Sequence, residues 1–157
     1  MLYFAYGSNL DWDQIKSRCP SSRYICNATL PDYKIAFRSS SRKRNCGVAD
    51  AMPSPGDIMW GVVYELSESD IFVLDEHEGF DRNRDPDKNS YNREMVTIFR
   101  DGDENSPVNA YIYLTVPEEG VHIPNDAYKS HIVNGAKFWN LPADYIRFLE
   151  NIPTNES

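Results

Sequence analysis

Apolar residues are distributed along the chain in two patterns, as short continuous runs and at helical spacing. The short runs are rich in aromatic and β-branched residues and predict strands at 2–6, 23–30, 33–38, 47–52, 58–66, 93–99 and 108–116. Helical spacing behind polar capping residues predicts helices at 11–18, 67–78, 126–139 and 142–151.

Turn-forming residues separate these elements. Pro31-Asp32 and the segment Pro53–Asp57 are expected to end strands, and Asp101-Gly102 to join two of them. Because strands and helices do not alternate regularly, a doubly wound parallel sheet is disfavoured. We expect one α+β domain over 1–157, with a mixed, strongly curved or closed β-barrel flanked by helices.

The charge of the chain limits its partners. A net charge of −8 disfavours nucleic-acid binding, since phosphates require a basic surface. The basic segment Arg38–Arg44 is interpreted as a solvated hairpin loop, with a local contact patch as the alternative. Three cysteines without metal-site spacing favour a reducing cytosol, and the lack of a long apolar run predicts no membrane insertion.

The first apolar run stops at Gly7-Ser8-Asn9, and a helical pattern follows at once. This order predicts a buried strand that leads into a tight turn, where Gly7 adopts a positive φ or allows another group to approach the backbone. Such a turn can direct several backbone N–H groups at one point, as proteins do to hold an oxyanion. Taken alone, the turn favours a purely geometric role for glycine, because junctions of this kind between a strand and a helix are common.

Asp75-Glu76-His77-Glu78 is the densest ionisable cluster. Consecutive helical residues point about 100° apart, so these four cannot converge on one metal ion. Asp75 and Glu78 are three residues apart and share a helix face. Glu78 directly precedes Gly79, where removal from water would raise its pKa toward the range of a general base. The alternative is a solvated acidic helix end.

The chain carries no phosphate-binding glycine motif and no recognisable serine-nucleophile motif. It does contain a series of other motifs in order: Tyr3–Leu10 with Tyr-Gly-Ser-Asn, Ser54–Asp57 followed by Trp60–Tyr64, Leu74–Gly79, Tyr91–Arg93, Tyr111–Leu114, Tyr128, Asn134–Ala136 and Leu141-Pro142. Together they resemble the γ-glutamylcyclotransferase family, including its AIG2-like relatives.

That resemblance implies a small mixed barrel and a reaction in which the α-amine of a γ-glutamyl group attacks its own γ-carbonyl. The products are 5-oxoproline and a free amine, which would place the protein in glutathione metabolism. The resemblance makes Glu78 catalytic and implies substrate-binding residues at the turn and in two later elements: Tyr3, Phe4, Ala5, Tyr6, Gly7, Ser8, Asn9, Tyr113 and Tyr128. It implies no metal and no organic cofactor, and it leaves a homodimer open.

The polar segment from Phe80 to Ser90 is longer than a minimal connection after the catalytic glutamate. We expect Arg82, Arg84 and Lys88 to influence which amine is accepted, a plain surface insertion being the alternative. Two other functions stay open at this point. One is a non-catalytic small-molecule binding module on the same fold, and the other is a cyclotransferase for a γ-glutamylated specialised metabolite.

Overall fold

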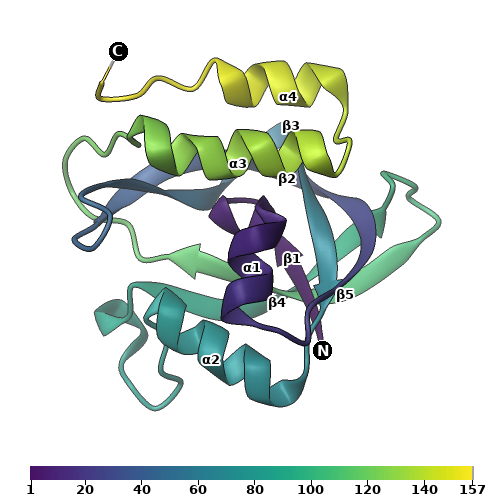
Figure 1. Cartoon of the computed structure of the whole chain (residues 1–157), viewed down its shortest axis with the longest axis horizontal. Coiled ribbons are helices and arrows are strands. Elements are labelled where there is room, and N and C mark those ends of the chain that lie inside the picture. Colours follow the sequence, from purple (N-terminus) through teal and green to yellow (C-terminus); the bar gives the residue numbers. More distant parts are fainter. Residues whose placement is uncertain (157) are drawn as a thin grey trace.

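Five strands close into a small barrel in the computed structural model, which describes residues 1–156 of the single domain predicted over 1–157; Ser157 lies outside the described residues (Figure 1). The strands are β1 (Leu2–Ala5), β2 (Arg23–Ser41), β3 (Cys46–Glu65), β4 (Tyr91–Arg100) and β5 (Pro107–Thr115), in the spatial order β1-β3-β2-β4-β5. β1 pairs with β5 in parallel, and the other pairs of neighbours are antiparallel. The predicted mixed, closed barrel is confirmed.

The predicted breaks at Pro31-Asp32 and Pro53–Asp57 are wrong as strand ends, because β2 and β3 run through them as one long hairpin. Pro31 pairs with Ile58 and Tyr33 pairs with Pro53, so residues 54–57 all lie opposite Asp32. Asp32 and Gly56 have positive φ, and the Gly56 N–H donates to Asp32 Oδ1 at 2.9 Å. The turn residues therefore form a bulge within the hairpin instead of ending it.

Four α-helices and two 3₁₀ turns surround the barrel in the part of the chain that the structure describes: η1 (Ser8–Leu10), α1 (Trp12–Arg18), α2 (Glu68–Glu78), η2 (Pro86–Lys88), α3 (Asp126–Phe138) and α4 (Ala143–Glu150). In Figure 1, α3 and α4 lie along one side of the barrel and α2 lies at the opposite side. Asp11 and Ser67 accept backbone N–H groups at the starts of α1 and α2, as the capping patterns predict. No helix within residues 1–156 combines the length and apolarity needed to span a membrane.

The turn after β1 is held by direct backbone packing against α3. A Cβ added at Gly135 would lie 2.3 Å from the carbonyl carbon of Leu10, so only glycine allows α3 to approach η1 this closely. Leu10 is fully buried, and the Trp139 indole N–H donates to its carbonyl oxygen at 3.0 Å. α3 therefore fixes the position of the turn that sequence analysis selected.

We expect Gly135→Ala to destabilise the protein by about 1–3 kcal/mol, because the added methyl must push α3 away from η1. Thermal or urea unfolding measures this change. Lys137→Ala on the same helix is a matched control, since the Lys137 side chain forms an exposed ion pair with Glu150. Equal stability of Gly135→Ala and the wild type would contradict the close packing.

Candidate active site

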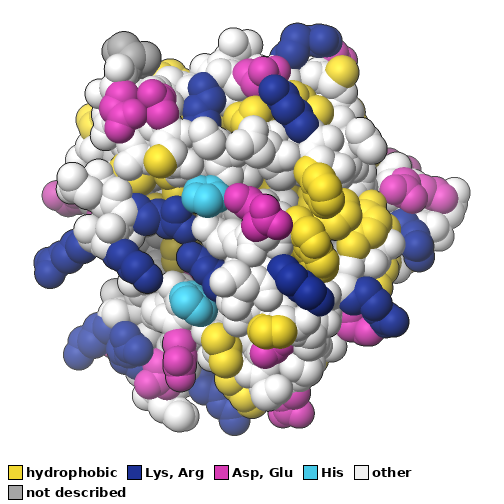
Figure 2. Space-filling view, viewed as in Figure 1, with side chains coloured by type: hydrophobic (Ala, Val, Ile, Leu, Met, Phe, Trp, Pro, Cys, Tyr) yellow, Lys and Arg dark blue, Asp and Glu magenta, His cyan; other side chains and the backbone are white. Residues whose placement is uncertain are grey.

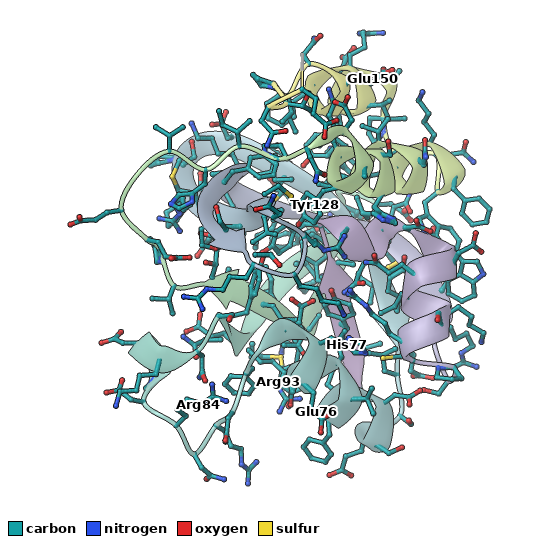
Figure 3. The ribbon with its side chains drawn as sticks, turned by 60° about the vertical axis from the view of Figure 1, so that its left-hand side comes forward. Glu76, His77, Arg84, Arg93, Tyr128 and Glu150 are labelled. Atoms are coloured by element: carbon teal, nitrogen blue, oxygen red, sulfur yellow. The ribbon has the colours of Figure 1, made fainter. Side chains whose placement is uncertain are left out.

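Two adjoining hollows are bordered by η1, by α3 and by the C-terminal end of α2. The inner chamber is lined by the turn 7–9, Glu78, Ala49 and five tyrosines, Tyr3, Tyr6, Tyr91, Tyr113 and Tyr128. It shares Ser8, Glu78, Tyr91 and Tyr128 with an outer cleft of about 490 Å³. Figure 3 shows Tyr128 of α3 and His77 of α2, which both line the outer cleft, on opposite sides of it. The shared lining makes the chamber and the cleft one continuous space.

Glu78 is the last residue of α2 and reaches this space because the helix stops there. Gly79 adopts the left-handed conformation with φ of 68°, and the Phe80 N–H donates back to the Asp75 carbonyl at 2.9 Å. A Cβ on Gly79 would lie 2.9 Å from the Ser90 side chain. Burial raises the pKa of Glu78 to about 7, against the opposing effects of Arg18, Arg44 and a hydrogen bond from Asn9.

The Asn9 side chain holds the Glu78 carboxylate. Asn9 Nδ2 lies 3.2 Å from Glu78 Oε1 and 3.0 Å from the Tyr3 hydroxyl. Asn9 Oδ1 accepts from Gln14 Nε2 at 2.9 Å and from Arg18 at 3.1 Å. Because a guanidinium can only donate, Asn9 must turn its oxygen to Arg18 and its NH₂ group to Glu78. Arg18 and Gln14 thus orient the amide that contacts the carboxylate.

The backbone N–H groups of residues 7–9 lie at the start of the turn. The first bond of η1 runs from the Leu10 N–H to the Gly7 carbonyl at 3.0 Å, so the N–H groups of residues 7–9 precede the hydrogen-bonded part of the turn. These residues line the chamber beside Glu78. Gly7 has φ of −111°, and an added Cβ would lie 3.2 Å from the Ala49 Cβ. Of the two uses predicted for Gly7, the structure shows the close approach and not the positive φ.

The five chamber tyrosines differ in whether the hydroxyl donates or accepts a hydrogen bond within the protein. The hydroxyls of Tyr6, Tyr91 and Tyr113 donate to the Tyr113 carbonyl, the Ala49 carbonyl and Asp75 Oδ1 respectively. Tyr3 and Tyr128 instead accept hydrogen bonds, from Asn9 and from the Ala49 N–H. A phenol has one proton, and the hydrogen bonds that Tyr3 and Tyr128 accept do not use it.

Asp75 anchors the helix that carries Glu78. Its carboxylate accepts from the Tyr113 hydroxyl at 2.6 Å and pairs with Arg93 at 3.5 Å. The Arg93 guanidinium also lies over the Tyr111 ring, 4.6 Å from its centroid. Burial raises the pKa of Asp75, while Tyr113 and Arg93 oppose that effect. Asp75 and Glu78 therefore share one face of α2, where Asp75 anchors the helix and Glu78 lines the chamber.

The structure brings together most, but not all, of the residues selected from the sequence. Phe4 and Ala5 are fully buried in the core and do not line the chamber, since the Phe4 ring packs against Gly61. Arg82 and Arg84 line a separate hollow beside α2, and Figure 3 shows Arg84 far from Tyr128. Of the three loop cations, Lys88 lines the outer cleft.

Sequence analysis missed Gln14, Arg18, Arg44 and Tyr91 as parts of the site. Arg44 lies in the predicted hairpin loop, and its guanidinium donates to Gln14 Oε1 at 3.0 Å and lies over the Tyr128 ring. The basic segment is thus a hairpin turn that also borders the cleft. Charge was the signal for Arg44, because cations of this acidic chain cluster in that segment, and the motif Tyr91–Arg93 was the signal for Tyr91.

The sequence and the fold of this chain are similar to those of known proteins. The model of the AIG2-like family matches residues 58–149, more than half of the chain. The chain belongs to the AIG2-like family. Proteins named gamma-glutamylcyclotransferase from Homo sapiens and Mus musculus are 35% and 36% identical to it, over 99% of this chain and 80% of each relative. A solved structure titled gamma-glutamyl cyclotransferase superposes with a TM-score of 0.87 at 33% identity, covering 100% of this chain and 90% of that one.

Membership in the AIG2-like family confirms the resemblance drawn from the motifs. The family model begins within β3 and ends within α4, so it includes Glu78, Tyr113 and Tyr128 but not the turn at residues 7–9. The full-length similarity to the human and mouse proteins covers the turn as well.

We expect Glu78→Gln to stabilise the fold above pH 7. The raised pKa of Glu78 means that the folded state binds its proton more tightly than the unfolded chain, so ionisation costs stability as pH rises from 4.5 to about 7. Glutamine removes that cost, which is on the order of 1–3 kcal/mol. Unfolding measured at several pH values should show the gain above pH 7 and none below pH 4.5. A gain independent of pH would contradict the assignment.

Proposed function

We propose that the protein is a γ-glutamylcyclotransferase, which cyclises a γ-glutamyl amide to 5-oxoproline and releases an amine or amino acid. The observation that carries the proposal is a carboxylate with a pKa of about 7, held by Asn9 beside the backbone donors of residues 7–9. Relatives of that name that align with 99% of this chain support it.

Glu78 supplies the proton transfers of this reaction. The substrate α-ammonium cannot attack while protonated, so the Glu78 carboxylate takes one proton. The nitrogen lone pair then forms a bond to the γ-carbonyl carbon, and the carbonyl electron pair moves onto oxygen. When that pair returns, the bond from carbon to the leaving nitrogen breaks, and Glu78 gives its proton to that nitrogen. The freed carboxylate then takes the second proton from the ring nitrogen, which becomes the lactam N–H of 5-oxoproline, and passes it to the released amine, which leaves as an ammonium. A pKa near 7 suits these transfers at neutral pH.

The turn and two tyrosines stabilise the charge that develops. Backbone N–H groups of residues 7–9 are the donors we assign to the oxyanion, because they line the chamber beside Glu78. Tyr3 and Tyr128 offer hydroxyl protons to polar groups of the glutamyl chain. The reaction is intramolecular, so holding the chain folded in a small chamber supplies much of the acceleration.

The proposal involves a small-molecule γ-glutamyl substrate and a single copy of the chain. Every group named above comes from one chain, so the reaction does not require the homodimer left open by the sequence. The cytosol is the compartment we propose, since Cys19, Cys26 and Cys46 are buried free thiols.

We expect Glu78→Gln to lower the release of 5-oxoproline from γ-glutamyl-alanine by about 10²–10⁴-fold, because the reaction loses its base. Ser8→Ala is the contrasting variant. The Ser8 hydroxyl accepts from Gln14 Nε2 at 2.9 Å and is not a nucleophile, so the loss should be within about tenfold. Comparable losses in the two variants, or near-normal turnover by Glu78→Gln, would contradict these roles.

We expect kcat/KM to fall as pH drops below about 7, since protonated Glu78 cannot accept the substrate proton. Arg18 favours the ionised carboxylate, so Arg18→Met should move this acid limb to higher pH. Lys16→Met on the same helix is a matched control, because Lys16 bonds the carbonyls of Pro20 and Ser22 outside the chamber. A pH profile unchanged by Arg18→Met would refute the electrostatic link.

A further inference from the structure

The outer cleft gathers cations that lack carboxylate partners. Arg18, Arg42, Arg44 and Lys88 line it, and among residues 1–156 none of them forms an ion pair. The chain as a whole has a net charge of −8, so this gathering departs from its average surface. Figure 2 shows Lys and Arg side chains collected left of centre, over the region between the β2–β3 hairpin and α2.

The four cations fall into two pairs. Arg18 and Arg44 serve the inner site through Asn9, Gln14 and Tyr128. Arg42 and Lys88 are exposed and lie on elements that border the cleft, Arg42 in the β2–β3 turn and Lys88 at the end of η2. The outer pair is therefore available for a ligand.

Side-chain hydrogen bonds hold the loop that carries Lys88 in place. Buried Asn89 accepts from the Asp81 N–H and donates to the Asp81 carbonyl, both at 3.3 Å. It also donates to Asn92 Oδ1 at 2.8 Å, and Asn92 in turn donates to the Pro86 carbonyl at 3.1 Å. These bonds fix η2 against the start of β4, so Lys88 has a defined place at the cleft.

The charges of the cleft also limit what it accepts. Glu76, Asp87 and Glu118 border it as well, and Glu118 accepts from the Ser40 N–H at 3.3 Å. These carboxylates repel a polyanion such as a phosphate ester more strongly than a ligand that carries a single carboxylate. The cleft thus suits a ligand with one negative charge.

We propose that Lys88, together with Arg42, is a specificity-determining residue that binds the carboxylate of the leaving amino acid. This inference rests on the proposed function, which puts the γ-glutamyl group in the inner chamber and the leaving group in the outer cleft. The loop from Phe80 to Ser90 then selects γ-glutamyl amino acids over γ-glutamyl amines through Lys88, and not through Arg82 or Arg84.

The test compares γ-glutamyl-alanine with γ-glutamyl-alaninamide, which lacks only the charge of the leaving group. The readout is the ratio of the two kcat/KM values for 5-oxoproline release. We expect Lys88→Met to lower this ratio about tenfold by weakening turnover of γ-glutamyl-alanine. Arg82→Met, with the same change of charge on the same loop, should leave the ratio unchanged, and melting temperatures should show that both variants fold.

Each other outcome has a distinct meaning. A ratio unchanged by Lys88→Met, or lowered equally by Arg82→Met, overturns the assignment of Lys88 and leaves the proposed function intact. No 5-oxoproline from either substrate with the wild-type protein rejects the proposed function and the assignment with it. Added salt should lower kcat/KM for γ-glutamyl-alanine more than for the amide, because exposed charges are screened.

Discussion

The hydrogen bond between Asn9 and Glu78 is the interaction on which the site depends. It joins two residues 69 positions apart, one in the turn after β1 and one at the end of α2. Both ends are held from behind, Asn9 by Arg18 and Gln14, and the Glu78 helix by Asp75. The side chain that completes the turn therefore also sets the position of the carboxylate.

This arrangement partly removes an acid from water, and the surrounding residues reduce the penalty. Arg18 and Arg44 favour the ionised form of Glu78 without forming an ion pair with it among the described residues. A direct pair would hold the carboxylate too firmly to accept and return a proton. The balance leaves a pKa of about 7, between a solvated glutamate and a fully buried one.

Much of this could be predicted from the sequence, for local reasons. Capping residues, Gly79 and the apolar runs determine the helices and most strands, and the ordered motifs indicated the family and Glu78. The hairpin bulge was missed, because Pro and Gly mark a local turn but do not reveal that a partner strand continues beside it. Arg44 was missed because it reaches Gln14 from 30 positions along the chain. Gln14 and Arg18 lie five and nine positions from Asn9, but their contact with its side chain depends on how α1 packs against η1. Phe4 was placed in the chamber by its neighbours in the motif, whereas alternation along β1 turns its side chain into the core.

The dependence of the turn on α3 has a consequence for how the protein matures. Synthesis runs from the N-terminus, so residues 7–9 and Glu78 emerge from the ribosome before the helix that supports them. α3 supplies Tyr128 to the chamber wall, and Gly135 lets it seat on Leu10. A nascent chain that ends before α3 thus holds the acid, the amide and the turn without the surface that assembles them. The order of translation therefore makes α3, which supports the turn and supplies Tyr128, the last contributor to the chamber.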